Sequence, residues 1–128
     1  MTSGKWSETQ PSVTIASVED LDRFVDFAES KAERPTAISI DVHGYQVDLL
    51  VGHEKSFVHM TPDDLEQPYH VTVGGPSEGG VDFWLYSWHH TWFKNRHLIA
   101  KALARQAIRE FFQTGRLSAA VEWEQYFA

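Results

Sequence analysis

The chain has 128 residues, of which 42% are hydrophobic and 23% are charged, and it contains no cysteine. This length and composition predict one globular domain with its own core, and the missing cysteines exclude disulfides, thiolate metal sites and a cysteine nucleophile. The formal net charge of −7 argues against a basic, phosphate-neutralising surface, so we expect no binding to nucleic acid or to a membrane. An acidic surface favours a basic partner, although solubility alone would explain the same charge.

The N-terminal segment, residues 1–11, is polar, and we expect it to be flexible ahead of a single domain that spans residues 12–128. No stretch of the chain reaches the roughly 18 apolar residues that a membrane-spanning helix needs. The segment also lacks the apolar centre of a signal peptide, which predicts a cytoplasmic protein.

Residues 13–16 alternate as in a short strand, and an amphipathic helix follows them. Ser17 stands before Glu19 and Asp20, a pattern close to a helix N-cap with acids in the first turn. The helix is predicted to end before Pro35. Its apolar stripe, with Phe24 at the edge, consists of Val18, Leu21, Val25, Ala28 and Ala32.

Four or five strands are predicted in the middle of the chain. Residues 36–42 and 45–51 alternate on either side of His43-Gly44, a two-residue connection typical of a β-hairpin. Further strands are expected over residues 56–60, 69–73 and 81–86. The connections are short, which favours an antiparallel meander.

A second helix is predicted over about residues 96–114, and Gly115 is well placed to end it. One half of this helix is apolar, and the other carries a polar, mostly basic stripe made of Lys101, Arg105, Arg109 and Gln113. A last strand over residues 119–124 carries Trp123, whose replacement by alanine would cost about 3–5 kcal/mol if the ring lies in the core. The predicted fold class is therefore α+β, an antiparallel meander sheet of about six strands with two helices packed on one face.

None of the residue patterns predicts an active site. His89 and His90 are adjacent, so in a strand their side chains point to opposite faces and cannot share a metal ion. The acids Asp63 and Asp64 fit an exposed turn after Pro62. The chain has no Gly-x-Ser-x-Gly nucleophile motif and no phosphate-binding glycine loop. We therefore predict no catalytic residue, no metal ligand and no cofactor.

Residues 83–93 are densely aromatic. Alternation along a strand buries one set of side chains and places Trp84, Tyr86 and Trp88 on the other face. Exposed Trp and Tyr side chains often anchor protein interfaces, but a helix or loop that covers them is equally compatible with the pattern. A small ligand-binding domain or enzyme, with a pocket between Trp84 and His90, is the alternative to a protein-binding function.

The C-terminal third of the chain resembles a known protein family. The residues that carry the resemblance are Arg96-His97-Leu98-Ile99, residues 104–116 (ending in Phe111-Phe112-Gln113-Thr114-Gly115-Arg116) and Val121-Glu122-Trp123-Glu124. This ending, an Ala-rich helix, a Phe-x-x-Thr-Gly turn and a last strand with Val-x-Trp, is similar to that of the first-numbered immunity-protein family of bacterial polymorphic toxin systems. The resemblance implies an antitoxin that binds and neutralises a cognate toxin, commonly a nuclease or a nucleic-acid deaminase, by occlusion.

A toxin that acts on nucleic acid has a basic cleft, which an acidic domain can occupy. Loops beside a rigid sheet often carry function, so the expected contacts are acidic loop residues and one apolar anchor. These residues are Asp63, Asp64, Glu66, Glu78, Asp82 and Trp88. Plugging of the toxin's active site and binding beside it are both compatible with these contacts, and the oligomeric state is not predicted.

Overall fold

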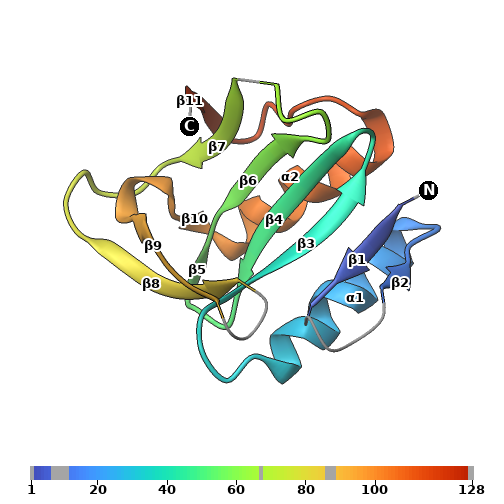
Figure 1. Cartoon of the computed structure of the whole chain (residues 1–128), viewed down its shortest axis with the longest axis horizontal. Helices are drawn as coiled ribbons and strands as arrows, with labels where there is room; N and C mark the ends of the chain where they lie inside the picture. The colour runs from blue at the N-terminus through green and yellow to red at the C-terminus, as the bar shows by residue number, and fades with distance from the viewer. Residues whose placement is uncertain (1, 7–11, 67, 86–88, 127–128) are drawn as a thin grey trace.

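The computed structural model describes residues 2–6, 12–66, 68–85 and 89–126, and shows two α-helices against one face of an open, mostly antiparallel sheet (Figure 1). The predicted α+β class is confirmed. In the described ranges no helix is long and apolar enough to cross a membrane. The strands are β1 (Ser3–Lys5), β2 (Val13–Thr14), β3 (Thr36–Val42), β4 (Tyr45–Val51), β5 (Lys55–Ser56), β6 (Val58–Pro62), β7 (Tyr69–Val73), β8 (Gly80–Leu85), β9 (His89–Lys94), β10 (Ile99–Ala100) and β11 (Glu122–Tyr126); the helices are α1 (Val18–Lys31), the short 3₁₀ helix η1 (Asn95–His97) and α2 (Lys101–Thr114).

The centre of the sheet is the predicted antiparallel meander, with β3, β4, β6 and β7 side by side and β11 added at the edge beside β7. The β3–β4 connection is the two-residue turn expected from the sequence. Both of its residues have positive φ, 50° at His43 and 79° at Gly44, as a tight hairpin turn requires. The His43 ring Nε2 lies 2.8 Å from the Phe112 carbonyl oxygen, which ties the turn to the end of α2.

Two parts of the sheet differ from the prediction. β8 does not continue the meander beside β7 but pairs in parallel with β3, and β9, which was not predicted, pairs with β8. Residues 3–5 of the segment expected to be flexible form β1, which pairs with β2 and β3. A Cβ atom on Gly4 would lie 2.6 Å from the Phe24 ring, so the missing side chain allows β1 to lie against α1.

The first helix follows its prediction closely. The Ser17 side chain accepts a hydrogen bond from the Asp20 amide at 3.1 Å and caps the N-terminus. Three residues of the predicted apolar stripe, Leu21, Val25 and Ala28, are buried, and so is Phe24 at its edge. The helix ends at Lys31, before Pro35 as expected.

The second helix begins at Lys101 and not at residue 96 as predicted. The backbone just before it bonds to the end of β7: the amides of Gly74 and Gly75 donate to the Arg96 carbonyl, and the Thr72 hydroxyl donates to the His97 carbonyl. These partners hold residues 95–100 in η1 and β10. The helix therefore begins at Lys101, although the apolar pattern typical of a helix begins several residues earlier. The C-terminus agrees with the prediction, since Gly115 has a φ of 72°.

Two clusters of buried side chains hold the sheet, one on each face. The larger lies between the sheet and the two helices and includes Leu21, Ile38, Val47 and Phe111. The smaller lies on the opposite face, where Phe83 of the β8–β9 hairpin packs with Ala37, Leu50, Phe57 and Leu98. β3 is buried on both faces at this end, which explains its almost continuous burial.

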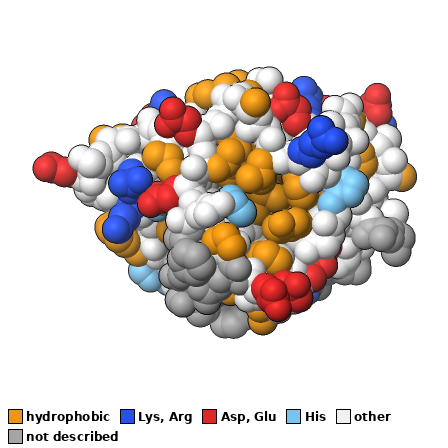
Figure 2. All heavy atoms as spheres, turned by 90° about the horizontal axis from the view of Figure 1, so that it is seen from above, with side chains coloured by type: hydrophobic (Ala, Val, Ile, Leu, Met, Phe, Trp, Pro, Cys, Tyr) orange, Lys and Arg blue, Asp and Glu red, His pale blue; other side chains and the backbone are white. Residues whose placement is uncertain are grey.

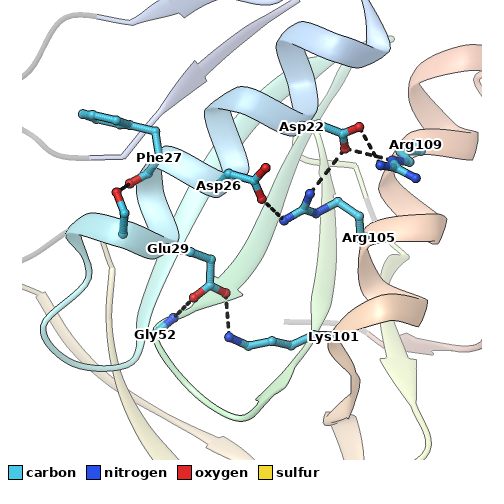
Figure 3. A network of polar contacts seen from close by, with 9 residues as sticks. Asp22, Asp26, Phe27, Glu29, Gly52, Lys101, Arg105 and Arg109 are labelled. Carbon is cyan, nitrogen blue, oxygen red and sulfur yellow. Dashed lines mark hydrogen bonds and ion pairs between the residues drawn. The ribbon is translucent and has the colours of Figure 1, made fainter.

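The basic stripe predicted on α2 faces α1 (Figure 3). Arg109 donates two hydrogen bonds to Asp22, at 2.8 and 2.5 Å, and Arg105 lies 2.9 Å from an Asp26 oxygen. Lys101 lies 2.9 Å from Glu29, whose other oxygen accepts the Gly52 amide. The three cations of the stripe are therefore paired with acids inside the molecule.

The Asp22–Arg109 pair should make the stability of the fold depend on pH. The hydrogen bond from Arg109 is the main cause that lowers the pKa of Asp22 below its ordinary 3.8. An acid whose pKa falls on folding stabilises the fold above its ordinary pKa and loses that contribution as the pH falls through the lowered value. We expect Asp22→Asn to lower the free energy of unfolding by about 1 kcal/mol or less at neutral pH, and by almost nothing near pH ~2.

Urea unfolding of both proteins across this pH range measures the effect. Glu54→Gln is the matched control, because Glu54 is exposed on the turn between β4 and β5. A stability difference between Asp22→Asn and the parent that stays constant with pH would contradict the prediction.

Candidate functional site

The acidic turn, residues 62–66 at the end of β6 and before β7, holds three of the predicted contact residues. Asp63, Asp64 and Glu66 are all exposed there, together with Leu65. Backbone hydrogen bonds join Asp63 to Gly44 and Leu65 to Pro62, both at 2.9 Å. The Asp64 side chain also accepts the Glu66 amide at 2.9 Å, so the turn is held in one conformation.

Leu65 is the unusual residue of this turn. Its side chain is 66% exposed and its backbone has a φ of +62°, in the left-handed region that a leucine rarely adopts. Such a conformation costs about 1 kcal/mol or more and persists only where the surroundings impose it. A strained backbone that holds an exposed apolar side chain between carboxylates suggests a binding role for the turn.

A fourth carboxylate, Asp41, lies near the acidic turn. Asp41 is exposed on β3, and the Asp63 amide bonds to Gly44 in the β3–β4 turn, which brings the two segments together. Burial is the largest cause that raises the pKa of Asp41 above its ordinary 3.8, and the charges of Asp63 and Asp48 raise it further. The charges of Asp63 and Asp48 therefore each oppose ionisation of Asp41, and a cation at this surface would relieve that repulsion.

The other predicted contacts lie elsewhere. Glu78 is exposed in the β7–β8 loop, at the left of Figure 1, whereas the acidic turn lies near the β3–β4 turn on the upper right. Asp82 is on β8, and one of its oxygens lies 3.0 Å from His90 Nε2. Trp88 lies outside the described residues. The structure thus brings Asp63, Asp64 and Glu66 together but separates them from Glu78 and Asp82.

The outer side of the β8–β9 hairpin carries aromatic side chains. Trp84 and His90 are cross-strand partners with ring centres 5.1 Å apart, and the Arg34 guanidinium lies 4.0 Å from the centre of the Trp84 ring. Trp92 is 53% exposed. Part of the segment considered as a ligand pocket, residues 86–88, lies outside the described ranges, and the described part presents Trp84 and His90 side by side on a strand surface.

Three polar side chains stand in a row across the open face of β3, β4 and β6. The Ser39 hydroxyl donates to Asp48 Oδ1 at 2.8 Å, and His59 Nδ1 lies 3.5 Å from Asp48 Oδ2. Activation of a serine nucleophile requires the histidine to contact the hydroxyl, with the acid behind it. In this row the acid is in the middle, so the geometry does not support nucleophilic catalysis. In the described part of the chain, no group of three or more His, Cys, Asp and Glu residues is arranged to hold a metal ion.

Seen from above, the molecule presents hydrophobic side chains in the middle of one face, with Asp, Glu, Lys and Arg side chains around them (Figure 2). An apolar centre with a charged border is the usual organisation of a protein–protein interface. Among the described residues, six partly buried hydrophobic side chains pack against the main core: Trp6, Ala32, Tyr45, Phe112, Val121 and Trp123.

Sequence reasoning missed Asp41, Asp48 and Leu65. The alternation of β3 and β4 contains a signal for the first two, because each stands between apolar residues that point to the helices. The pairing register, which brings Asp48 and the acidic turn each to the neighbourhood of Asp41, is not visible in that alternation. Nothing in the sequence marks Leu65, since its backbone conformation depends on the turn around it.

Comparison with known proteins adds one finding. A sequence model of the family described as Immunity protein Imm1 matches residues 10–125, which is most of the chain and extends well beyond the C-terminal resemblance. No curated protein matches the chain.

Proposed function

The chain belongs to the Imm1 immunity protein family, and from this premise we propose that it binds a cognate toxin through the acidic turn and neutralises it by occlusion. The proposed toxin acts on nucleic acid, as a nuclease or a deaminase, and meets its immunity protein in the bacterial cytoplasm. Residues 12–128 would form the immunity-type domain. The chain would act by binding and not by catalysis.

The observation that carries this proposal is the construction of the acidic turn. Asp63, Asp64 and Glu66 surround Leu65, whose exposed side chain and positive φ have no evident benefit to the fold. An apolar anchor bordered by charge is the arrangement that gives a protein interface both affinity and orientation. The cations of the basic stripe on α2 are paired with acids of α1, so they are not available to neutralise the carboxylates of the acidic turn.

The charge of the surface supports a basic partner. Because Asp41 has a raised pKa, its ionised form costs the free protein stability at neutral pH, and a bound cation would remove that cost. A basic nucleic-acid cleft supplies such cations. Attraction between the two surfaces would also speed their encounter, in a manner that depends on salt.

Reversal of charge in the acidic turn should slow association with the toxin. We expect Asp63→Lys combined with Asp64→Lys to lower the association rate constant by about tenfold or more and to weaken its dependence on salt. The toxin is first identified by co-expression with the product of the neighbouring reading frame, pull-down and mass spectrometry. Surface plasmon resonance at several salt concentrations then measures the rate constants.

The matched control is Glu54→Lys combined with Glu122→Lys, which makes the same change in net charge at exposed positions away from the turn. Equal association rates for the two double variants would remove the acidic turn from the interface. An unaltered toxin activity in the presence of excess wild-type protein would refute the neutralising function itself.

A further inference from the structure

A small pocket lies on the face of the sheet opposite the helices, between the sheet and the β8–β9 hairpin. Its volume is about 180 Å³, close to that of one large side chain. Phe57, Phe83 and Phe93 form its apolar walls, and Asp48, His59 and Thr91 line it with polar groups. Asp48 raises the pKa of Asp41, which connects this pocket electrostatically to the acidic turn.

The apolar walls hold one another in place. The ring centres of Phe57 and Phe93 are 4.7 Å apart, those of Phe57 and Phe83 are 5.2 Å apart, and those of Phe83 and Phe93 are 5.9 Å apart. Phe57 and Phe83 are buried, so these rings have little freedom to fill the space themselves. The pocket is therefore formed before any partner arrives, which lowers the entropy cost of binding.

The carboxylate of Asp48 gives the pocket its charge. Its Oδ1 accepts hydrogen bonds from Ser39 Oγ at 2.8 Å and from Gln46 Nε2 at 3.1 Å. Both donors are neutral, so they orient the carboxylate without cancelling its charge. Its Oδ2 lies 3.5 Å from His59 Nδ1, longer than a normal hydrogen bond, and retains the capacity to accept a closer donor.

These features select among side chains. A leucine would fill the apolar walls but would cover the Asp48 carboxylate with apolar atoms, which is unfavourable for a charged group. A lysine would supply charge, but its ammonium is more strongly hydrated than a guanidinium and has no planar surface to stack on the aromatic walls. An arginine combines both requirements, because its planar guanidinium stacks on aromatic rings and donates to carboxylates.

We propose that this pocket receives one arginine side chain of the bound toxin, with the guanidinium between the phenylalanine rings and the Asp48 carboxylate. This inference rests on the proposed function. It places the interface on the open face of the sheet, from the acidic turn through Asp41 to the pocket, and makes Asp48 the residue that selects the charge of the inserted side chain.

Isolated amino-acid derivatives test the pocket without any toxin. The full chain, isotope-labelled, is titrated with the N-acetyl N′-methylamide derivatives of arginine, lysine and leucine while its amide NMR signals are recorded. We expect the arginine derivative to shift the signals of residues 57–59 and 91–93 with saturation in the millimolar range, at least about fivefold more tightly than the other two. Asp48→Asn should abolish this preference, whereas Asp82→Asn, which alters an acid paired with His90 on the outer side of the hairpin, should leave it unchanged.

Equal binding of the three derivatives, tighter binding of leucine or lysine, or the absence of saturable shifts would overturn the proposal. If Asp48→Asn fails to fold, Thr91→Leu takes its place, because it fills the pocket from its lining and should prevent binding of the arginine derivative. Each variant that folds is then measured against the toxin, where it should raise the dissociation constant at least about tenfold. Toxin binding that is unchanged in every variant that folds would overturn the pocket and leave the proposed function intact, whereas binding of the arginine derivative to a protein that binds no toxin would overturn the proposed function alone.

Discussion

Replacement of Phe57 by alanine is expected to lower the free energy of unfolding by about 3–5 kcal/mol. Phe57 is 1% exposed and contacts Phe83 and Phe93, so its removal leaves a cavity in the cluster that joins the β8–β9 hairpin to the sheet. Among the described residues, β8 pairs with β3 at two positions, so packing around Phe57 contributes much of the attachment of the hairpin to the sheet. Urea unfolding followed by circular dichroism measures the loss.

Trp123→Ala is the informative comparison. The sequence suggested a core tryptophan with a similarly large effect, but Trp123 is only partly buried against the edge of the main core. Its removal loses part of a hydrophobic contact and the hydrogen bond from Nε1 to the Ser118 carbonyl at 2.9 Å. We expect a loss of about 2 kcal/mol, and a loss as large as that of Phe57→Ala would contradict the order of the two sites.

Leu65→Asn should separate binding from folding. Asparagine tolerates the left-handed backbone better than leucine, so we expect the free energy of unfolding to stay the same or to rise slightly. The exposed apolar anchor is lost at the same time. If Leu65 is a central contact, the dissociation constant for the toxin should rise by about 30-fold, which corresponds to about 2 kcal/mol. Calorimetric titration with the toxin and urea unfolding of the free variant measure the two quantities.

The control for Leu65 is Leu117→Asn, which removes another exposed leucine, between α2 and β11. This variant should bind the toxin as tightly as the parent. If Leu65→Asn instead binds normally, Leu65 lies outside the interface, and if its fold is clearly destabilised, the side chain has a structural role.

Phe57 and Leu65 have different roles on the open face of the sheet. Phe57 keeps the hairpin on the open face of the sheet, and Leu65 stands in the turn at the other end of that face. A Phe57 variant that weakens toxin binding through loss of structure would also lose stability, whereas a Leu65 variant would not. Measurement of both quantities for both variants therefore distinguishes a surface that binds from a core that supports it.

Features that depend on a few neighbouring residues could be read from the sequence. The Ser17 cap, the His43-Gly44 turn, the glycine at the end of α2 and the apolar stripe of α1 all agree with the structure. For the caps and the turn, the decisive interaction joins residues no more than about one helical turn apart, and for the stripe the helical period alone determines which side chains share a face. The C-terminal resemblance to an immunity family is likewise confirmed by the match over residues 10–125.

Features that depend on distant partners were decided only by the tertiary structure. The same alternating pattern allows β8 to lie beside β7 or beside β3. The position beside β3 is favoured because it buries Phe83 of β8 against Ala37 and Phe57. The sequence predicts Arg109 as a base on the polar side of its helix, whereas in the structure α1 places Asp22 next to it. The acids chosen from the sequence share one charge, but only the register of the strands determines that Asp63 lies with Asp41 while Glu78 lies elsewhere. Side-chain type and local spacing determine what a segment can form, whereas the partner that buries it determines where its functional groups meet.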